Sequence, residues 1–188
     1  MGDAPQWHWQ PWHPGGRAED AARAWLAPRL GCDAAELALA RDAHGRPRLA
    51  PTHGFDIGWS HSGEGLLLAC GADMVLGVDL EREHLRPRAL ELARRFFQPR
   101  EAAWLEAQAG EARSAAFLRL WTAKEAVLKA HGRGLSFGLH RLAFEEHDGS
   151  LALVEADPAL GDPAYWRLRE FVPHPGYRAA LAWKPLDE

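Results

Sequence analysis

Residues 55–81 read FDIGWSHSGEGLLLACGADMVLGVDLE, and this stretch decides the fold. It contains three short apolar segments, at 55–62, 66–72 and 74–81, each bounded by Gly or Asp. The segments lie too close together along the chain to hold helices between them, and short apolar runs between turn residues are typical of strands. We therefore expect three antiparallel strands here.

Helical and strand patterns precede this stretch. Residues 17–30 place apolar side chains on one side of a helix that stops at Gly31. Residues 36–50 indicate two short strands around a turn rich in Gly and Pro, and residues 1–16 suit an extended arm packed onto the domain.

After residue 81 the sequence pattern is first typical of helices and then typical of strands. Three helices are expected first, because apolar residues recur at helical spacing from Pro87 onward. Paired apolar runs around Gly-containing turns then indicate hairpins. The expected helices cover about 87–97, 99–109 and 111–131, and the expected strands cover 141–146, 150–156, 166–172 and 177–184. The fold class is therefore α+β, with two small α+β halves packed together.

Composition excludes several classes of protein. The 188 residues include 47% hydrophobic and 26% charged residues, which is ordinary for a globular domain. The formal net charge is −4, whereas a protein that binds nucleic acids or anionic membranes in general is expected to be basic. No apolar run approaches the ~20 residues that span a bilayer, so we expect a cytoplasmic protein. Cys32 and Cys70 cannot build a disulfide framework and are expected to be small packing residues.

The strand expected at 74–81 ends with two carboxylates, Asp79 and Glu81. Because side chains alternate along a strand, both lie on the same face. Adjacent carboxylates repel each other, and a hard divalent ion such as Mg²⁺ would hold both ionised. The alternative is a strand end entering a solvated loop, with Arg82, Arg86 and Arg88 as ion-pair partners.

The helix expected at 111–131 presents Glu125 and Lys129 one turn apart, about 40° around the axis, with Lys124 on the other side of the apolar stripe. Glycines at 132 and 134 stop the helix and permit a close approach to a ligand. The alternative is an ordinary surface ion pair. Upstream, His61 at the end of its strand either donates to a phosphate or is a core histidine with its hydrogen bonds satisfied.

These features, in this order, resemble the paired signature of the 4′-phosphopantetheinyl transferase superfamily. A chain of this length with a Ser-His-Ser strand is similar to the Sfp-like branch, which is monomeric and folds as a pseudo-dimer of two similar α+β halves. Two departures are Gly58, where members often carry Asn, and a short N-terminal half. The matching elements are Gly45-Arg46-Pro47, WSHS (59–62), GVDLE (77–81), Phe97 to Glu101, and WTAKEA (121–126) with Lys129.

The resemblance implies an enzyme that transfers the 4′-phosphopantetheine arm of coenzyme A to a serine of an apo carrier protein and releases adenosine 3′,5′-bisphosphate. It implies a coenzyme A-binding half at 1–76 and a half at 77–188 that carries the metal strand, within one compact unit. Glu101 is a weaker candidate for water or metal contact. The implied roles are Mg²⁺ ligands Asp79, Glu81 and Glu125, catalytic residues Glu125, Lys129 and Asp79, and coenzyme A contacts Arg46, His61, Lys129, Arg17, Arg23 and Ser60.

The partner of such an enzyme is an acyl or peptidyl carrier protein, from fatty-acid, polyketide or non-ribosomal peptide synthesis. Because the chain is itself acidic, docking needs a local patch. Two other functions remain open: a metal-dependent phosphohydrolase, and a non-catalytic module that binds coenzyme A or a carrier protein. The docking candidates are Arg82, Arg86, Arg88, Arg94 and Arg95 beside Leu85, Leu90 and Phe96.

Overall fold

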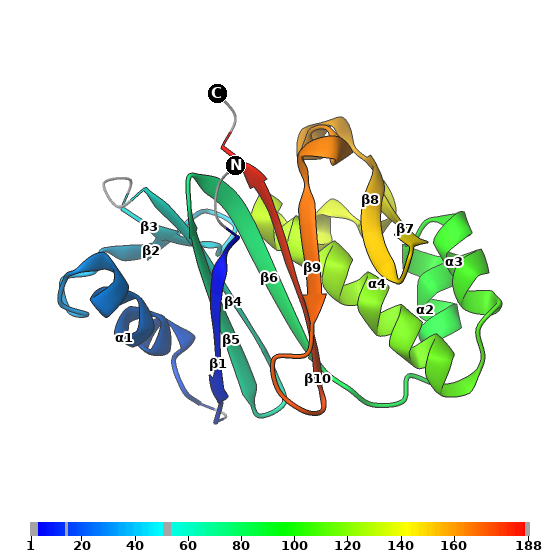
Figure 1. Ribbon diagram of the computed structural model, residues 1–188, viewed down its shortest axis with the longest axis horizontal. Coiled ribbons are helices and arrows are strands. Elements are labelled where there is room, and N and C mark those ends of the chain that lie inside the picture. The colour runs from blue at the N-terminus through cyan, green and yellow to red at the C-terminus, as the bar shows by residue number, and fades with distance from the viewer. Residues whose placement is uncertain (1–3, 14, 51–53, 187–188) are drawn as a thin grey trace.

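The computed structural model describes residues 4–13, 15–50 and 54–186. Two three-stranded antiparallel sheets form the centre of the molecule, with α1 at one end and α2 to α4 at the other (Figure 1). The α+β fold class is therefore confirmed. The first sheet has the order β1 (Gln6–Pro11), β5 (Gly65–Ala72), β4 (Phe55–Ser62), and the second has the order β6 (Met74–Arg82), β10 (Tyr177–Pro185), β9 (Arg167–Phe171).

The chain passes from the first sheet to the second at Asp73, whose φ of 54° is left-handed. The three strands expected in residues 55–81 all form, as β4, β5 and β6. β4 and β5 do pair antiparallel, but β6 pairs with β10 from the far end of the chain instead of with β5. β6 instead lies beside β4, and side chains join the two strands: Ser60 Oγ donates to Asp79 Oδ1 at 2.9 Å.

Each sheet carries its own helix. α1 (Ala18–Leu30) packs Trp25 and Leu26 against the first sheet, and α4 (Gly110–His131) packs along the second. Strand β1 forms within the extended arm expected at residues 1–16, of which residues 1–3 and 14 lie outside the described residues. The ring of Trp7 in this strand packs against Phe171 of β9 at a tilt of 39°, with the ring centroids 4.7 Å apart. The division into a half at 1–76 and a half at 77–188 stays a prediction. Strand β6 runs without interruption across this proposed boundary.

Smaller elements complete the two halves. The hairpins and helices expected from the sequence all form, with ends shifted by at most three residues. In the described part of the chain, no helix combines the length and apolarity needed to cross a bilayer. These elements are β2 (Leu39–Arg41) with β3 (Pro47–Leu49), α2 (Ala89–Phe96), α3 (Pro99–Glu106), β7 (Leu142–His147) with β8 (Ser150–Ala156), and the 3-10 helices η2 (Gly134–Phe137), η3 (Leu139–Arg141), η4 (Pro158–Leu160) and η5 (Pro163–Tyr165).

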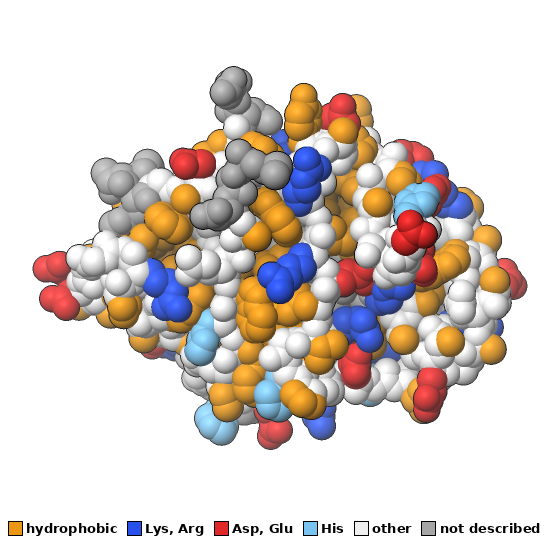
Figure 2. Space-filling model, viewed as in Figure 1, with side chains coloured by type: hydrophobic (Ala, Val, Ile, Leu, Met, Phe, Trp, Pro, Cys, Tyr) orange, Lys and Arg blue, Asp and Glu red, His pale blue; other side chains and the backbone are white. Residues whose placement is uncertain are grey.

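Charged side chains of both signs are interspersed over the face shown in Figure 2. Many form ion pairs across elements, such as Arg119 with Glu170 at 2.7 Å. This face therefore presents no single large basic patch, in agreement with the acidic net charge.

Candidate active site

The backbones of β6 and α4 touch at Gly77. A Cβ atom on this residue would lie 2.0 Å from the carbonyl oxygen of Ala126 and 2.4 Å from the amide nitrogen of Ala130. Only glycine fits such a backbone contact. This close approach brings the side chains of β6 within reach of Lys129 on α4.

Asp79 is the centre of a compact polar cluster. Asp79 is buried, with 3% of the residue exposed. Lys129 Nζ donates to Asp79 Oδ1 at 2.6 Å and to Ser60 Oγ at 2.8 Å, and Ser60 donates to the same Oδ1. Asp79 Oδ2 is buried without a hydrogen-bond partner among the described residues. Because a buried carboxylate oxygen without a partner is costly, it points to a group that completes the cluster.

Two further carboxylates surround this cluster. Glu81 Oε2 accepts hydrogen bonds from Arg86 Nη2 at 2.9 Å and from Ser62 Oγ at 3.2 Å, while Glu125 Oε2 lies 4.0 Å from Lys129 Nζ. Burial, and then the charge of Asp79, raises the pKa of Glu81 and raises the pKa of Glu125 to about 7. The site therefore holds more negative charge than its own cations neutralise.

Lys129 shows the complementary effect. Burial alone would lower the pKa of Lys129, but the negative charges of Asp79 and Glu125 raise it above its ordinary value. The ammonium group therefore stays charged at neutral pH. It lies where a phosphate oxygen could replace one of its present partners.

The donor set of this cluster fits a hard divalent cation. As the side chains stand, no three Asp, Glu, His or Cys residues of the described chain are grouped as a finished metal cage. Carboxylate oxygens are nevertheless the ligands that Mg²⁺ prefers, and the partnerless Asp79 Oδ2 is one of them. Burial and the repulsion by Asp79 raise the pKa values of Glu81 and Glu125, and a bound cation would counteract both effects.

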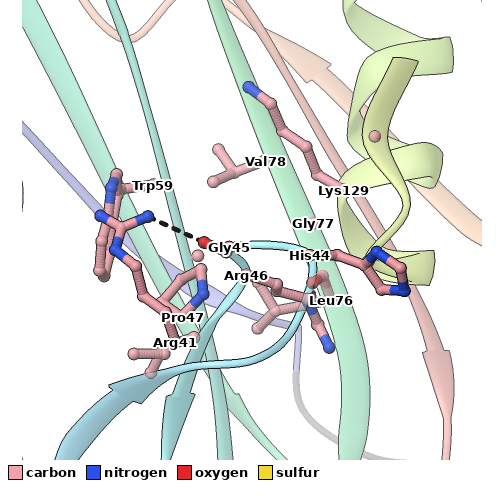
Figure 3. Close-up of a pocket in the computed structure, with 14 residues that line it drawn as sticks. Arg41, His44, Gly45, Arg46, Pro47, Trp59, Leu76, Gly77, Val78 and Lys129 are labelled. Atoms are coloured by element: carbon pink, nitrogen blue, oxygen red, sulfur yellow. Dashed lines mark hydrogen bonds between the residues drawn. The ribbon is translucent and has the colours of Figure 1, made fainter. Parts of the chain in front are cut away.

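A cavity of about 190 Å³ adjoins Lys129 (Figure 3). Its walls come from the β2–β3 turn, β4, β6 and the residues after α4, including Gly132 and Gly134. Arg46 of the turn is buried, and its guanidinium donates to Asp56 and to the carbonyl of Leu76 at 2.8 Å. Arg46 therefore holds the turn against β4 and β6, with its charge paired inside the protein.

The other expected coenzyme A contacts lie apart from Asp79. His61 points to the opposite side of β4 from Ser60 and stacks on Trp12, with the ring centroids 5.7 Å apart. It lines a second cavity of about 290 Å³ together with the exposed Arg17. Arg23 lines neither cavity, because its guanidinium donates to the carbonyls of Leu37 and Leu39 and ties α1 to the following segment.

Glu101 lies in a different part of the fold. Its Oε2 is 2.7 Å from Lys124 Nζ, and its Oε1 accepts the amide hydrogen of Phe144 at 2.9 Å. It also caps α3 by accepting the backbone N–H of Gln98. Its carboxylate is thus fully used in packing α3 against α4 and β7. The Gln-x-x-Glu spacing of a capping box was visible in the sequence as the signal for this role.

Two residues of the site were not singled out from the sequence. Arg41 and Trp59 line both cavities, and the guanidinium of Arg41 lies 5.3 Å from the centre of the Trp59 ring. Trp59 shares a strand face with His61, so alternation along β4 could have indicated it. No local signal marks Arg41, since its position depends on how the β2–β3 hairpin folds over β4.

A family profile and a solved structure resemble this chain. Residues 75–182 match the family profile ACPS, described as the 4′-phosphopantetheinyl transferase superfamily. A crystal structure of Thermotoga maritima holo-[acyl-carrier-protein] synthase (AcpS) aligns with a TM-score of 0.47 and 21% identity, over 60% of this chain and 64% of that chain.

Three relatives show similarity over most of the chain. A Synechocystis sp. protein is 38% identical over 79% of this chain and 60% of its own length. The 4′-phosphopantetheinyl transferase HetI of Nostoc sp. is 35% identical over 87% of this chain and 69% of its own length. Sfp of Bacillus subtilis is 26% identical over 85% of this chain and 68% of its own length. The chain thus spans three fifths to about two thirds of these relatives, and it belongs to the 4′-phosphopantetheinyl transferase superfamily.

Proposed function

We propose that this protein transfers the 4′-phosphopantetheine arm of coenzyme A to a serine hydroxyl of an apo carrier protein, with Mg²⁺, and releases adenosine 3′,5′-bisphosphate. The observation that carries the proposal is the Asp79–Lys129–Ser60 cluster beside a cavity, with the raised pKa values of Glu81 and Glu125. Family membership supports the same reaction class. The protein is expected to act as a monomer in the cytoplasm.

Asp79, Glu81 and Glu125 would hold the metal ion. When bound, the ion supplies positive charge to the pyrophosphate oxygens of coenzyme A, which lowers the barrier to breaking the phosphoanhydride bond. Lys129 adds a fixed positive charge on the same side of the site. Ser60 orients both Asp79 and Lys129 through its hydroxyl.

Glu125 is the residue best suited to accept the proton of the incoming serine. Without the ion, burial and then the charge of Asp79 raise the pKa of Glu125 to about 7, and a bound cation would favour its ionised form, which is the form able to accept a proton. Its side chain is 14% exposed, and among the described residues its carboxylate accepts no protein hydrogen bond. Its oxygens are therefore available to a hydroxyl that enters from solvent.

The coenzyme A contacts follow from the two cavities. Lys129 would bind the pyrophosphate, and the turn held by Arg46 would form a wall next to the nucleotide. His61 and Arg17 supply polar groups to the second cavity. Arg23 holds α1 in place, so its contribution to this site is indirect.

The carrier protein would dock beside the end of β6. Glu81 is followed there by the loop 83–88, in which the side chain of Leu85 is 62% exposed. Arg88 and its partner Glu91 are both on the surface. Arg86 is less available for docking than the sequence suggested, because it is bound to Glu81.

The test incubates the protein with coenzyme A, Mg²⁺ and a panel of apo carrier proteins, and reads the carrier by intact mass. We expect one phosphopantetheine arm per carrier, none on a carrier whose serine is replaced by alanine, and none in excess chelator. Release of free phosphopantetheine without a carrier would identify a hydrolase instead. Binding of coenzyme A with no product of either kind would identify a binding module.

A further inference from the structure

Both hydrogen bonds to the Glu81 carboxylate end on the same oxygen. Arg86 Nη2 donates to Oε2 at 2.9 Å, and Ser62 Oγ donates to the same atom at 3.2 Å. Among the described residues no hydrogen bond to the other oxygen, Oε1, is found, and the side chain of Glu81 is 21% exposed. The protein therefore fixes one oxygen of Glu81 and leaves the other available to a ligand.

The two donors are themselves held by the fold. The backbone N–H of Arg86 donates to Ser114 Oγ at 3.1 Å, and Ser114 is buried on α4. Ser62, at the end of β4, accepts the backbone N–H of Arg82 at 3.1 Å. Arg86 and Ser62 thus reach Glu81 from backbone that is tied to α4 and to β6. Because the donors are fixed, they restrict how the carboxylate can turn.

A second arginine at the same end of β6 provides a comparison. Arg178 of β10 lies opposite Glu81 in the strand ladder, but it donates to Glu83 Oε1 at 2.9 Å. Arg86 and Arg178 are alike in side-chain exposure, 26% and 23%, and the Nε of each is buried without a partner among the described residues. They differ in the carboxylate that they hold. Arg86 holds a proposed metal ligand, whereas Arg178 holds a carboxylate of the following loop.

We propose that Arg86 is a positioning residue of the metal site: together with Ser62 it holds Oε2 of Glu81, so that Oε1 is the oxygen presented to the divalent cation. This inference rests on the proposed function, in which Glu81 is a metal ligand. Hydrogen-bond partners of ligating carboxylates fix the orientation of the ligand, and removing one typically costs about 10- to 100-fold in metal affinity or activity. In this role Arg86 acts through Glu81 and need not contact the cation or the substrate.

The sign of the effect separates positioning from simple charge. Arg86 carries a positive charge close to the proposed cation site, and like charges repel. If this charge were its main effect, or if Arg86 competed with the cation for Glu81, removing it would strengthen cation binding. Positioning predicts the opposite result, which is a loss of cation affinity when the guanidinium is removed.

The test titrates Mn²⁺ into the protein, without coenzyme A or carrier protein, and measures the free ion by electron paramagnetic resonance. Mn²⁺ takes the same oxygen ligands as Mg²⁺. We expect Arg86→Gln to weaken Mn²⁺ binding by about 10- to 100-fold. Arg86→Lys, which keeps a charged donor and loses the planar fork, should fall between this variant and the unaltered protein. Ser62→Ala should weaken binding by about 2- to 10-fold, the range for a neutral hydrogen bond.

Kinetics supply a second readout. With coenzyme A and an apo carrier protein, Arg86→Gln should raise the Mg²⁺ concentration for half-maximal transfer by a similar factor. Saturating Mg²⁺ should then restore most of kcat, because the ligands themselves are still present. A lower kcat at every Mg²⁺ concentration, with unchanged half-saturation, would identify a merely structural role and overturn the proposal.

Arg178→Gln is the matched control. It removes an arginine of similar exposure from the same end of β6 and leaves both hydrogen bonds of Glu81 in place. It should change Mn²⁺ affinity by less than about threefold. Asp79→Asn should abolish Mn²⁺ binding in the titrated range, which assigns the ion to this site. Thermal unfolding shows whether each variant is folded, and if Arg86→Gln does not fold, Ser62→Ala decides the question.

The remaining results contradict the inference in distinguishable ways. Tighter Mn²⁺ binding by Arg86→Gln would show that Arg86 competes with the cation, and unchanged binding would show that Glu81 does not depend on it. Either result would overturn the inference and leave the proposed function standing, as would an equal loss of affinity in Arg178→Gln. If the unaltered protein binds no Mn²⁺, or Asp79→Asn binds it normally, the metal site of the proposed function fails and the inference fails with it.

Discussion

Helix α4 carries two lysine–carboxylate pairs of nearly equal length that differ in everything around them. Lys124 Nζ lies 2.7 Å from Glu101, and Lys129 Nζ lies 2.6 Å from Asp79. Five residues turn a helix by about 140°, so the pairs occupy different sides of α4. Lys124 is fully buried, whereas Lys129 opens onto a cavity.

The difference is in how completely each pair is satisfied. Lys124 also donates to the carbonyls of Leu139 and Leu142, and both oxygens of Glu101 accept hydrogen bonds or ion pairs. Asp79, in contrast, keeps one buried oxygen without a partner. We call Lys124–Glu101 the closed pair and Lys129–Asp79 the open pair. The closed pair contributes to the architecture, while the open pair, with surplus negative charge around it, can bind a ligand.

Removing the open carboxylate should have the largest effect of all. Asp79→Ala takes away the partner of both Lys129 and Ser60 and a proposed metal ligand, so turnover should fall by about a thousandfold or more. Thermal unfolding should show a folded protein. Transfer is measured by intact mass of the carrier, and near-normal turnover of this variant would contradict the site.

Lys129→Ala should lower turnover by about a hundredfold, since it removes one fixed cation from a site that would still bind a metal ion. Lys124→Ala is the matched variant on the same helix, and it should lose stability with much less effect on the turnover of folded protein. Steady-state kinetics and denaturant unfolding of both variants measure the two effects. The opposite ranking would mean that the roles of the two lysines are exchanged.

Breaking the closed pair should destabilise the protein. Glu101→Ala leaves the Lys124 charge buried, which costs about 3–5 kcal/mol of unfolding free energy. The double variant Glu101→Leu, Lys124→Met should recover most of this loss, because it leaves no unpaired charge. Urea unfolding measures both, and a double variant as unstable as the single one would indicate a packing role instead.

The closed pair should also make stability depend on pH. Burial lowers the pKa of Lys124 to about 8 from 10.5, although Glu101 opposes this shift. Because the folded protein releases this proton at lower pH than the unfolded chain does, stability should increase as pH rises from about 8 to about 10.5, by up to about 1.4 kcal/mol per pH unit. Subtracting the same pH series for Lys124→Met isolates this contribution, and two parallel curves would contradict it.

The smallest expected effect concerns the surface beside the open pair. Leu85→Ser combined with Arg88→Glu should raise the KM for the carrier protein a few-fold and flatten its salt dependence, because rim groups act mainly on encounter. The KM for coenzyme A should not change. Arg100→Glu, on α3 and paired with Glu145 at 3.0 Å, is a control outside the docking candidates. Unchanged carrier kinetics at low salt would place the docking surface elsewhere.

Local patterns in the sequence predicted most of the secondary structure. Strands such as β4 and β10, the β7–β8 hairpin and the end of α4 at Gly132 follow from alternation, turn residues and a left-handed glycine, which are properties of neighbouring residues. Alternation also placed Asp79 and Glu81 on one face. The i, i+4 spacing placed Glu125 beside Lys129. The sequence by itself thus determined the elements and the chemical groups that each one offers.

Tertiary structure decided which of these groups meet. Asp79 reaches Lys129 because Gly77 lets β6 touch α4, and across a sequence separation of 50 no local signal indicates that contact. The same long-range packing engages the guanidinium groups of Arg46 and Arg23 in hydrogen bonds within the protein, and it places Arg41 beside both cavities. Glu101 and Asp79 both offer a carboxylate, and the sequence does not distinguish them. Glu101 forms a buried ion pair with both oxygens bonded, and Asp79 keeps one oxygen without a partner, because only folding determines which oxygens find partners.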